Sequence, residues 1–498
     1  MISCFAGLVD ALRSTASEDL RHVADETKTI GTAFASPTKQ FFVSMLTRDI
    51  DLRDAILDLL DNCVDGILRT VKPDDGTSEP YAGYQATIVM APDHFQILDN
   101  CGGIPFETAK KYAFAMGKPA GALDDAVPAT VGMYGIGMKR AIFKLGTDAL
   151  VESWNDTGFY VEFTPQWMAK EGWDDLPVHE LPEGKLKAKG TSITVIELNG
   201  EVKAAFSSTE WIDDFRKVVA QHYSIILSKG LEVRVGSSLN DAASILPEPF
   251  QLLQTGTVNG GQIAPYIYKG MLGGVEVEIY AGLYRELLSA EEADREEETR
   301  GTTDDAGWTV ACNDRVVIWK DKTRLTGWGE ATVPNYHGQF IAITGIVLMR
   351  SDDPRKLPLT TTKRGIDAAS NVYSEAKELM REATKSLTSF TNKWKKFPDR
   401  LETLYRASKY VDLPALRTMA SEVPMVAMRK LPEMQKYEPA YPSPTEEKTH
   451  VVVRFEAPKT DVSFLREVYF GKGEPAKAGD IGREAFARAV RLARGIGK

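Results

Sequence analysis

The segment DLLDNCVDG, from Asp58 to Gly66, constrains the fold more than any other part of this 498-residue chain. It lies in a run whose apolar side chains recur every three or four residues, which predicts an amphipathic helix that buries one stripe. Asp58, Asn62 and Asp65 are spaced so that two carboxylates and an amide share one face of that helix. A hydrated magnesium ion would satisfy the amide oxygen. The alternative is an exposed polar stripe, which is ordinary on helix surfaces.

Charge and composition exclude several classes of protein. Lys and Arg number 60 against 70 Asp and Glu, so the net charge of -10 argues against strong sequence-independent attraction to nucleic acid. The four cysteines are far apart and show no C-x-x-C spacing, which argues against a disulfide framework and a structural zinc site. The chain shows no secretory signal pattern and no run of about eighteen apolar residues. We therefore expect a cytoplasmic protein that does not span a membrane.

The first half of the chain predicts an α+β fold. A helical pair is expected over residues 36–70, and alternating apolar residues predict strands after it. Helices combined with mostly antiparallel strands favour a sandwich in which helices cover one face of a sheet. The expected strands are 87–90, 95–98, 149–153, 158–164 and 191–198.

The second half predicts another α/β unit and a separate C-terminal part. A helix is expected at 208–227, a long helix at 366–396, and a charged exposed loop at 289–307. Residues 451–498 predict a strand followed by two helices. The strands expected between the two helices are 231–235, 275–280, 308–312, 315–319 and 339–348.

Two further motifs bear on chemistry. In ILDNCGGIP, Asp99 ends a predicted strand and is followed by two glycines, so its carboxylate can accept a hydrogen bond from a ligand amine while the backbone passes close to a ring. Taken alone, the same residues are an ordinary turn. In VGMYGIGMKRAIFKLG, glycines precede a helix whose exposed backbone N–H groups and dipole favour phosphate. The small-residue segment before it, between Pro105 and Thr130, is expected to close over a ligand as a lid.

The order of these motifs is the strongest signal. An acidic-Asn helix, D-x-x-G-G at a strand end, G-x-x-G-x-G before a helix, and KGTSITV on a later strand follow one another over residues 37–198. This order resembles the ATPase superfamily of DNA gyrase, the ninety-kilodalton heat-shock chaperones, histidine kinases and MutL (GHKL). The resemblance implies the Bergerat α/β sandwich, with ATP and Mg²⁺ as cofactors.

The resemblance assigns roles to individual residues. Asn62 looks like the magnesium-binding amide, and Asp65 a neighbour near the nucleotide. Asp99 would receive the adenine amino group, with Thr191 assisting through water, while Gly103 approaches the base. The glycine-rich loop, the amides that follow it and a nearby lysine would hold the phosphates. These phosphate-binding residues are Gly132, Gly135, Gly137, Met138, Lys139 and Lys118.

Two residues depart from the family pattern. Asp58 stands where hydrolysing members most often carry a glutamate as general base, and Cys101 stands where they carry a glycine. A general base needs contact at about 2.6 to 3.2 Å, directly or through one water, and aspartate reaches one methylene less far than glutamate. We therefore expect slow hydrolysis, with a non-hydrolysing switch or scaffold as the alternative. Cys101 fits the turn if its φ is negative.

A second domain is expected to complete the site. Residues 345–367 resemble the loop by which the middle domain of heat-shock chaperones, or the transducer domain of type II topoisomerases and MutL, reaches the γ-phosphate with a cation. Lys363 is the better positional match, with Arg364 adjacent, and it would neutralise developing charge as a catalytic residue. The alternative is a basic loop before a helix. The layout of this domain, with CNDRVVIW beside it, looks closest to microrchidia-type and related prokaryotic ATPases.

In these relatives ATP closes a lid and joins two N-terminal domains, so the resemblance implies an ATP-dependent homodimer that acts on DNA or a protein client, in repair, chromosome handling or defence. A histidine kinase is disfavoured because His22, the histidine upstream of the pocket, lacks the acid that phosphoacceptor helices place beside it. DNA binding rests on a basic last helix, for which a solvated face is the alternative. Its cations are Arg483, Arg488, Arg491, Arg494 and Lys498.

The expected domains are an N-terminal arm at 1–36, a GHKL ATP-binding domain at 37–206, a transducer-like or middle-like domain at 207–367, a helical region at 368–430, a linker at 431–450 and a small C-terminal α/β domain at 451–498.

Overall fold

The computed structural model describes residues 38–71, 78–115, 136–170, 176–287, 305–360, 365–397, 400–405, 407–444 and 453–495. The chain divides into two compact units, Met1–Pro444 and Thr445–Lys498. The described part of the larger unit contains two large sheets with helices packed on them and a two-stranded ribbon, so the mixed α+β class expected from the sequence is confirmed. Among the described residues, none of the helices combines the length and apolar character needed to cross a membrane.

The first sheet has eight strands in the order β5-β4-β3-β6-β2-β1-β7-β8. Adjacent strands are antiparallel, except that β1 and β7 run parallel. Strands β2 and β6 are antiparallel neighbours, so the end of β2 lies near the start of β6. The strands are β1 (Gln85–Met90), β2 (Phe95–Asp99), β3 (Ala149–Trp154), β4 (Gly158–Phe163), β5 (His179–Glu180), β6 (Gly190–Val195), β7 (Glu232–Gly236) and β8 (Ala243–Ser244).

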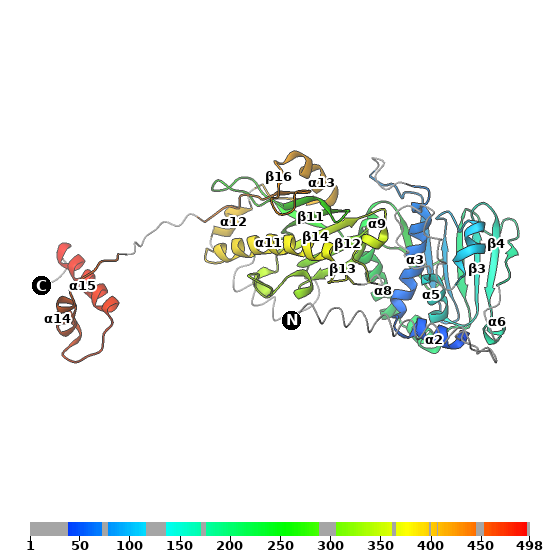
Figure 1. Ribbon diagram of the computed structural model, residues 1–498, viewed down its shortest axis with the longest axis horizontal. Helices are drawn as coiled ribbons and strands as arrows, with labels where there is room; N and C mark the ends of the chain where they lie inside the picture. The colour runs from blue at the N-terminus through cyan, green and yellow to red at the C-terminus, as the bar shows by residue number, and fades with distance from the viewer. Residues whose placement is uncertain are drawn as a thin grey trace, which may run out of the picture. The chain divides into compact units, whose positions relative to one another are not determined.

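Helices pack on this sheet, and the predicted helical pair is confirmed as α2 (Lys39–Arg48) and α3 (Leu52–Leu68). Asp51 caps α3 by accepting a hydrogen bond from the Arg53 N–H, and the apolar stripe of α3 is buried in the core. Figure 1 shows α3 and α5 (Gly137–Leu145) beside each other against the sheet. The other helices between α3 and β7 are α4 (Phe106–Thr108), the π-helix η1 (Ala109–Ala113), α6 (Pro165–Ala169), α7 (Gly200–Phe206), α8 (Thr209–His222) and α9 (Ser224–Ser228).

The first sheet continues past residue 206, where the sequence placed the end of the ATP-binding domain. Helices α8 and α9 lead into β7, which pairs with β1, so this part of the chain completes the first sheet. The sequence does not reveal this, because a parallel pairing over a long crossover leaves no local pattern.

The second sheet has seven strands in the order β13-β12-β14-β11-β10-β17-β16. Helix α11 (Asn371–Trp394), which lies along it in Figure 1, confirms the long helix predicted there and buries an apolar stripe in the second core. A two-stranded ribbon, β9 (Gln251–Gln254) with β15 (Lys409–Asp412), forms a separate sheet that packs against the second sheet. The sheet strands are β10 (Tyr266–Leu272), β11 (Val275–Leu283), β12 (Gly307–Cys312), β13 (Arg315–Asp321), β14 (Ile343–Arg350), β16 (Val426–Ala427) and β17 (Met434–Tyr437).

Shorter helices complete the larger unit. They are η2 (Arg324–Thr326), η3 (Gly338–Phe340), η4 (Pro354–Lys356), α12 (Leu401–Leu404) and α13 (Leu413–Glu422).

Two expectations for the C-terminal third are wrong. The predicted linker at 431–450 contains β17, which adds to the edge of the second sheet by pairing with β10. In the smaller unit, residues 453–458 form no strand, and the described part consists of α14 (Lys459–Phe470) and α15 (Ala478–Ala493) rather than an α/β fold. Val453 and Phe455 are exposed, and a single apolar segment without a partner strand cannot form a ladder.

Candidate nucleotide site

The acidic face of α3 is buried except for its amide. Asp58 and Asp65 are 4% and 7% exposed, whereas Asn62 between them is exposed. Asp61, which the sequence did not single out, is 1% exposed. Buried carboxylates need partners. The exposed-stripe alternative is therefore wrong for the carboxylates, and the amide oxygen of Asn62 is the group open to a ligand.

Asp58 is paired with Arg140 of α5. The Arg140 Nη2 donates to Asp58 Oδ2 at 2.5 Å, and the two side chains are 10% and 4% exposed. A Cβ placed on Gly137 would lie 3.3 Å from the carboxyl carbon of Asp58, so the first residue of α5 packs directly against it. The predicted base and the predicted phosphate-binding helix therefore meet. Sequence reasoning gave Arg140 no role, because a pair separated by 82 residues has no local signature.

Asp99 lies at the end of β2 and is partly buried. Its Oδ1 accepts a hydrogen bond from the Cys101 N–H at 2.7 Å, and the Cys63 thiol of α3 donates to its Oδ2 at 3.5 Å. Burial raises the pKa of Asp99 to about 6, although the backbone N–H groups of Cys101 and Thr191 favour the ionised form. At neutral pH the group is therefore mostly a carboxylate, able to accept a hydrogen bond from a ligand.

Gly103 and Thr191 lie close to Asp99 through strands β3 and β6. Gly103 has φ +70, and a Cβ there would lie 2.2 Å from the carbonyl oxygen of Trp154. Thr191 Oγ1 is 3.1 Å from Ser153 Oγ, which accepts the N–H of Ile104 at 2.8 Å. The turn after Asp99 is thus packed against β3 as closely as a backbone permits, and Thr191 lies beside it.

Arg69 is a further residue of this site that the sequence did not reveal. It caps α3, and its Nη2 donates to the carbonyl oxygen of Gly103 at 2.6 Å. Burial lowers the pKa of Arg69, an effect that Asp65 and Asp99 oppose. One cation therefore links the C-terminal end of α3 to the turn after Asp99.

Lys139 and Met138 turn into the protein. The ammonium group of Lys139 donates to the carbonyl oxygen of Ala113 at 2.8 Å, and burial lowers its pKa to about 8. Met138 is 9% exposed. In this conformation the Lys139 side chain joins α5 to η1, and its backbone N–H stays in the first turn of the helix.

Four residues predicted for the nucleotide site lie outside the described residues: Lys118, Gly132, Gly135 and Lys363. His22, Arg364 and Lys498 lie outside them too. The expected lid segment lies largely outside them as well.

The close approach at Gly103 gives a direct test of the packing. Gly103→Ala is expected to lower the free energy of unfolding by about 3 kcal/mol or more, because the new methyl group meets a backbone carbonyl in addition to the left-handed φ. Gly184 is a matched control, since its φ is +78 with open space around it, and Gly184→Ala should cost only about 1 kcal/mol. Chemical denaturation measures both. Equal losses would contradict the close approach of Gly103 to Trp154.

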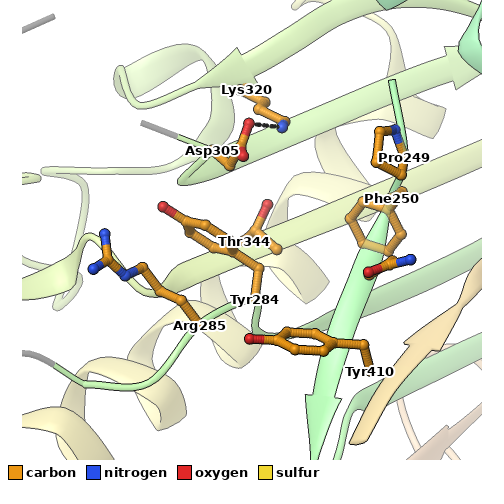
Figure 2. A pocket seen from close by; sticks show the side chains of 9 residues that line it. Pro249, Phe250, Tyr284, Arg285, Asp305, Lys320, Thr344 and Tyr410 are labelled. Carbon is orange, nitrogen blue, oxygen red and sulfur yellow. Dashed lines mark hydrogen bonds and ion pairs between the residues drawn. The ribbon is translucent and has the colours of Figure 1, made fainter. Parts of the chain in front are cut away.

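A separate cavity lies at one end of the second sheet and contains none of the predicted residues. Figure 2 shows Tyr284, Tyr410 and Phe250 around it, with Lys320 joined to Asp305 by an ion pair. Its volume is about 340 Å³. Lys320 has φ +45 and lies in a stretch where the β12–β13 register shifts. The lysine of this cavity is paired with an aspartate of the same cavity.

Within the described residues, no group of three or more His, Cys, Asp or Glu side chains is arranged to hold a metal ion. A magnesium ion bound through Asn62, water and phosphate needs no such group, because Mg²⁺ keeps several waters and uses few protein ligands. The exposed amide of Asn62 fits that role.

Comparison of the chain with models of protein families finds no match, and comparison with curated protein sequences finds no match either.

Proposed function

We propose that the chain is a magnesium-dependent ATPase of the GHKL type, with a Bergerat nucleotide fold built on the first sheet. The observation that carries this proposal is the convergence of predicted residues from four distant segments. Asp58 packs against Gly137, while the backbone N–H of Thr191 lies beside Asp99 and Gly103 follows directly in the same turn. The motif order over residues 37–198 supports the same assignment.

Each part of the site has a role in this proposal. Asp99 accepts the adenine amino group, and the glycine turn lets the ring lie close to the backbone. The N-terminus of α5 receives the phosphates. Magnesium, held by Asn62 and water, would neutralise phosphate charge. Asp58 accepts a proton from the attacking water. The water oxygen bonds to the γ-phosphorus while the bond between that phosphorus and the β–γ bridging oxygen breaks, which releases ADP.

The second candidate is a nucleotide-dependent switch that does not hydrolyse ATP. The observation that favours it is the ion pair of Asp58 with Arg140, which occupies the carboxylate that would have to accept the proton. Hydrolysis requires Asp58 to turn one oxygen toward water while Arg140 holds the other.

A homodimer formed on ATP binding, acting on a client, completes the proposal. Two observations favour a protein client over DNA. The arginines of α15 are paired within the helix, Arg483 with Asp480, and Arg488 and Arg491 with Glu484. The same unit exposes large apolar side chains, a feature of protein-binding surfaces. These are Phe455, Phe464, Val468, Phe486 and Leu492.

The proposal is tested by measuring ATP turnover together with molecular size under ATP, ADP and a non-hydrolysable analogue. We expect slow turnover and dimers with ATP or the analogue but not with ADP. Dimers without turnover would favour the switch. Binding of no nucleotide would exclude both.

The role of Lys363 is tested separately. Lys363→Ala is expected to lower turnover by about tenfold or more, because a cation at the γ-phosphate stabilises charge in the transition state. The neighbouring Arg364→Ala is the matched control and should change turnover by less than about threefold. Both rates are measured at saturating ATP. A larger effect of Arg364→Ala would assign the role to the arginine.

A further inference from the structure

The hairpin between β12 and β13 ends in a tight turn at the junction of the two sheets. Cys312 pairs with Arg315, and the two residues between them, Asn313 and Asp314, have φ values of 47° and 66°. Two consecutive left-handed residues define the type I′ turn, which matches the twist of a hairpin. The turn therefore places both Asp314 and Arg315 at the end of the hairpin. We call residues 312–315 the hairpin tip.

Arg315 reaches from the hairpin tip to α3. Its Nε donates to Asp61 Oδ1 at 3.0 Å, and the two side chains are 3% and 1% exposed. The hydroxyl of Tyr223 is 2.5 Å from the same oxygen, and the guanidinium lies 4.2 Å from the Tyr223 ring centre. Breaking a buried ion pair of this kind is strongly unfavourable. The tip and α3 are therefore held together.

Asp314 links the hairpin tip to β14 as well. It accepts hydrogen bonds from Lys229 at 2.5 Å and from Arg350, the last residue of β14, at 3.0 Å. Burial alone would raise the pKa of Asp314, but Arg350 and Lys229 hold it at about 2. The Asn313 side chain exchanges two hydrogen bonds of 3.1 Å with the backbone of Ser351.

The junction also contains open space. A cavity of about 470 Å³ borders the hairpin tip and is lined from both sides of the junction, by Leu68 and Tyr81 on one and by Asp314 and Arg350 on the other. Close-packed interiors resist displacement, so a cavity beside the tip leaves room for it to shift.

From these contacts we infer that the hairpin tip transmits nucleotide occupancy from α3 to β14, with Arg315 as the positioning residue. The inference rests on the proposed ATPase function. Asp61 follows Asp58 by three residues on one rigid helix, so a displacement of Asp58 by nucleotide moves Asp61, and the buried pair carries Arg315 with it. A purely structural pair would stabilise the junction but transmit nothing.

The test is hydrogen–deuterium exchange of the full chain, with and without a non-hydrolysable ATP analogue, alongside analogue affinity and ATP turnover. In wild type we expect analogue binding to change exchange in residues 307–321 and 343–350. In Arg315→Gln that change is expected to disappear and turnover to fall by about tenfold or more, with affinity within about threefold of wild type. Arg315→Lys should restore part of the turnover.

Arg417→Gln is the matched control, because Arg417 pairs with Glu278 in the same sheet at 2.9 Å and touches no part of α3 in that pair. It should keep both the exchange response and the turnover. If Arg315→Gln does not fold, Tyr223→Phe removes only the hydroxyl beside Asp61 and is expected to weaken the exchange response while affinity is kept.

The outcomes separate the two proposals. An unchanged exchange response and turnover in a folded Arg315→Gln, or in Tyr223→Phe where that variant replaces it, would overturn the coupling alone. So would a wild type that hydrolyses ATP without any change at the hairpin. A wild type that binds no ATP would overturn the proposed function and the coupling with it.

Discussion

Replacing Asp99 by asparagine is expected to weaken ATP binding by about 100-fold and to make the protein more stable at neutral pH. The Cys101 N–H holds one carboxylate oxygen, so the asparagine oxygen is expected to take that position. Its NH₂ group would then face the adenine amino group, donor against donor. Stability should rise by about 2 kcal/mol because the variant no longer buries a charge. Titration calorimetry and chemical denaturation measure the two effects.

The direction of the predicted stability change follows from the pKa of Asp99. The folded value of about 6 lies above the ordinary value of 3.8. The neutral acid therefore stabilises the folded state at low pH, and that stability is lost as the pH rises through about 6. The advantage of Asp99→Asn should be present at pH 7 and absent near pH 4. In wild type, ATP affinity should have the opposite pH dependence to stability: it should fall as the pH drops below about 6.

Asp93→Asn is the control for this prediction, since Asp93 lies in the same β1–β2 hairpin but is exposed. It should leave ATP affinity unchanged. Loss of affinity in both variants, or in neither, would contradict the assignment of Asp99 to the adenine.

The second large effect is expected at Asp58. Asp58→Asn should lower ATP turnover by about 100-fold or more while ATP affinity stays within about threefold, because an amide cannot accept the proton from water. The asparagine oxygen still accepts the hydrogen bond from Arg140, so the fold is kept. Asp58→Ala would instead leave the arginine buried without its partner and cost about 3 kcal/mol of stability. Single-turnover kinetics with denaturation curves separate the two.

Asp58→Glu tests the missing methylene. If reach limits the rate, this variant should turn over ATP faster than wild type. Turnover unaffected by Asp58→Asn would show that another group accepts the proton. If both wild type and Asp58→Glu bind ATP and neither hydrolyses it, the result would favour the non-hydrolysing switch.

The sequence predicts this site to the extent that its information is local. The spacing of Asp58, Asn62 and Asp65 identifies a helix face, and the glycines after Asp99 identify a turn, because both patterns lie within a few residues. The partners Arg140 and Arg69 are fixed by packing between segments far apart in the chain. Asp61 shows the same limit, since its role depends on Arg315, 254 residues away.

Strand pairing is the part of the fold that the sequence does not predict. Strand β17 has only four residues and forms because β10 offers an open edge, which nothing in its own sequence records. The apolar residues at 453–458 look like a strand and form none, since a strand exists only through its neighbour.

The parallel pairing of β1 with β7 has a consequence for dissecting the molecule. A fragment ending at residue 206 would expose the edge of β1 and remove Phe215, Tyr223 and Val233 from the first core. Open apolar edges associate with one another, so such a fragment should aggregate. The first sheet therefore depends on residues 207–244, and the smallest piece of chain able to keep it intact must run at least to β8.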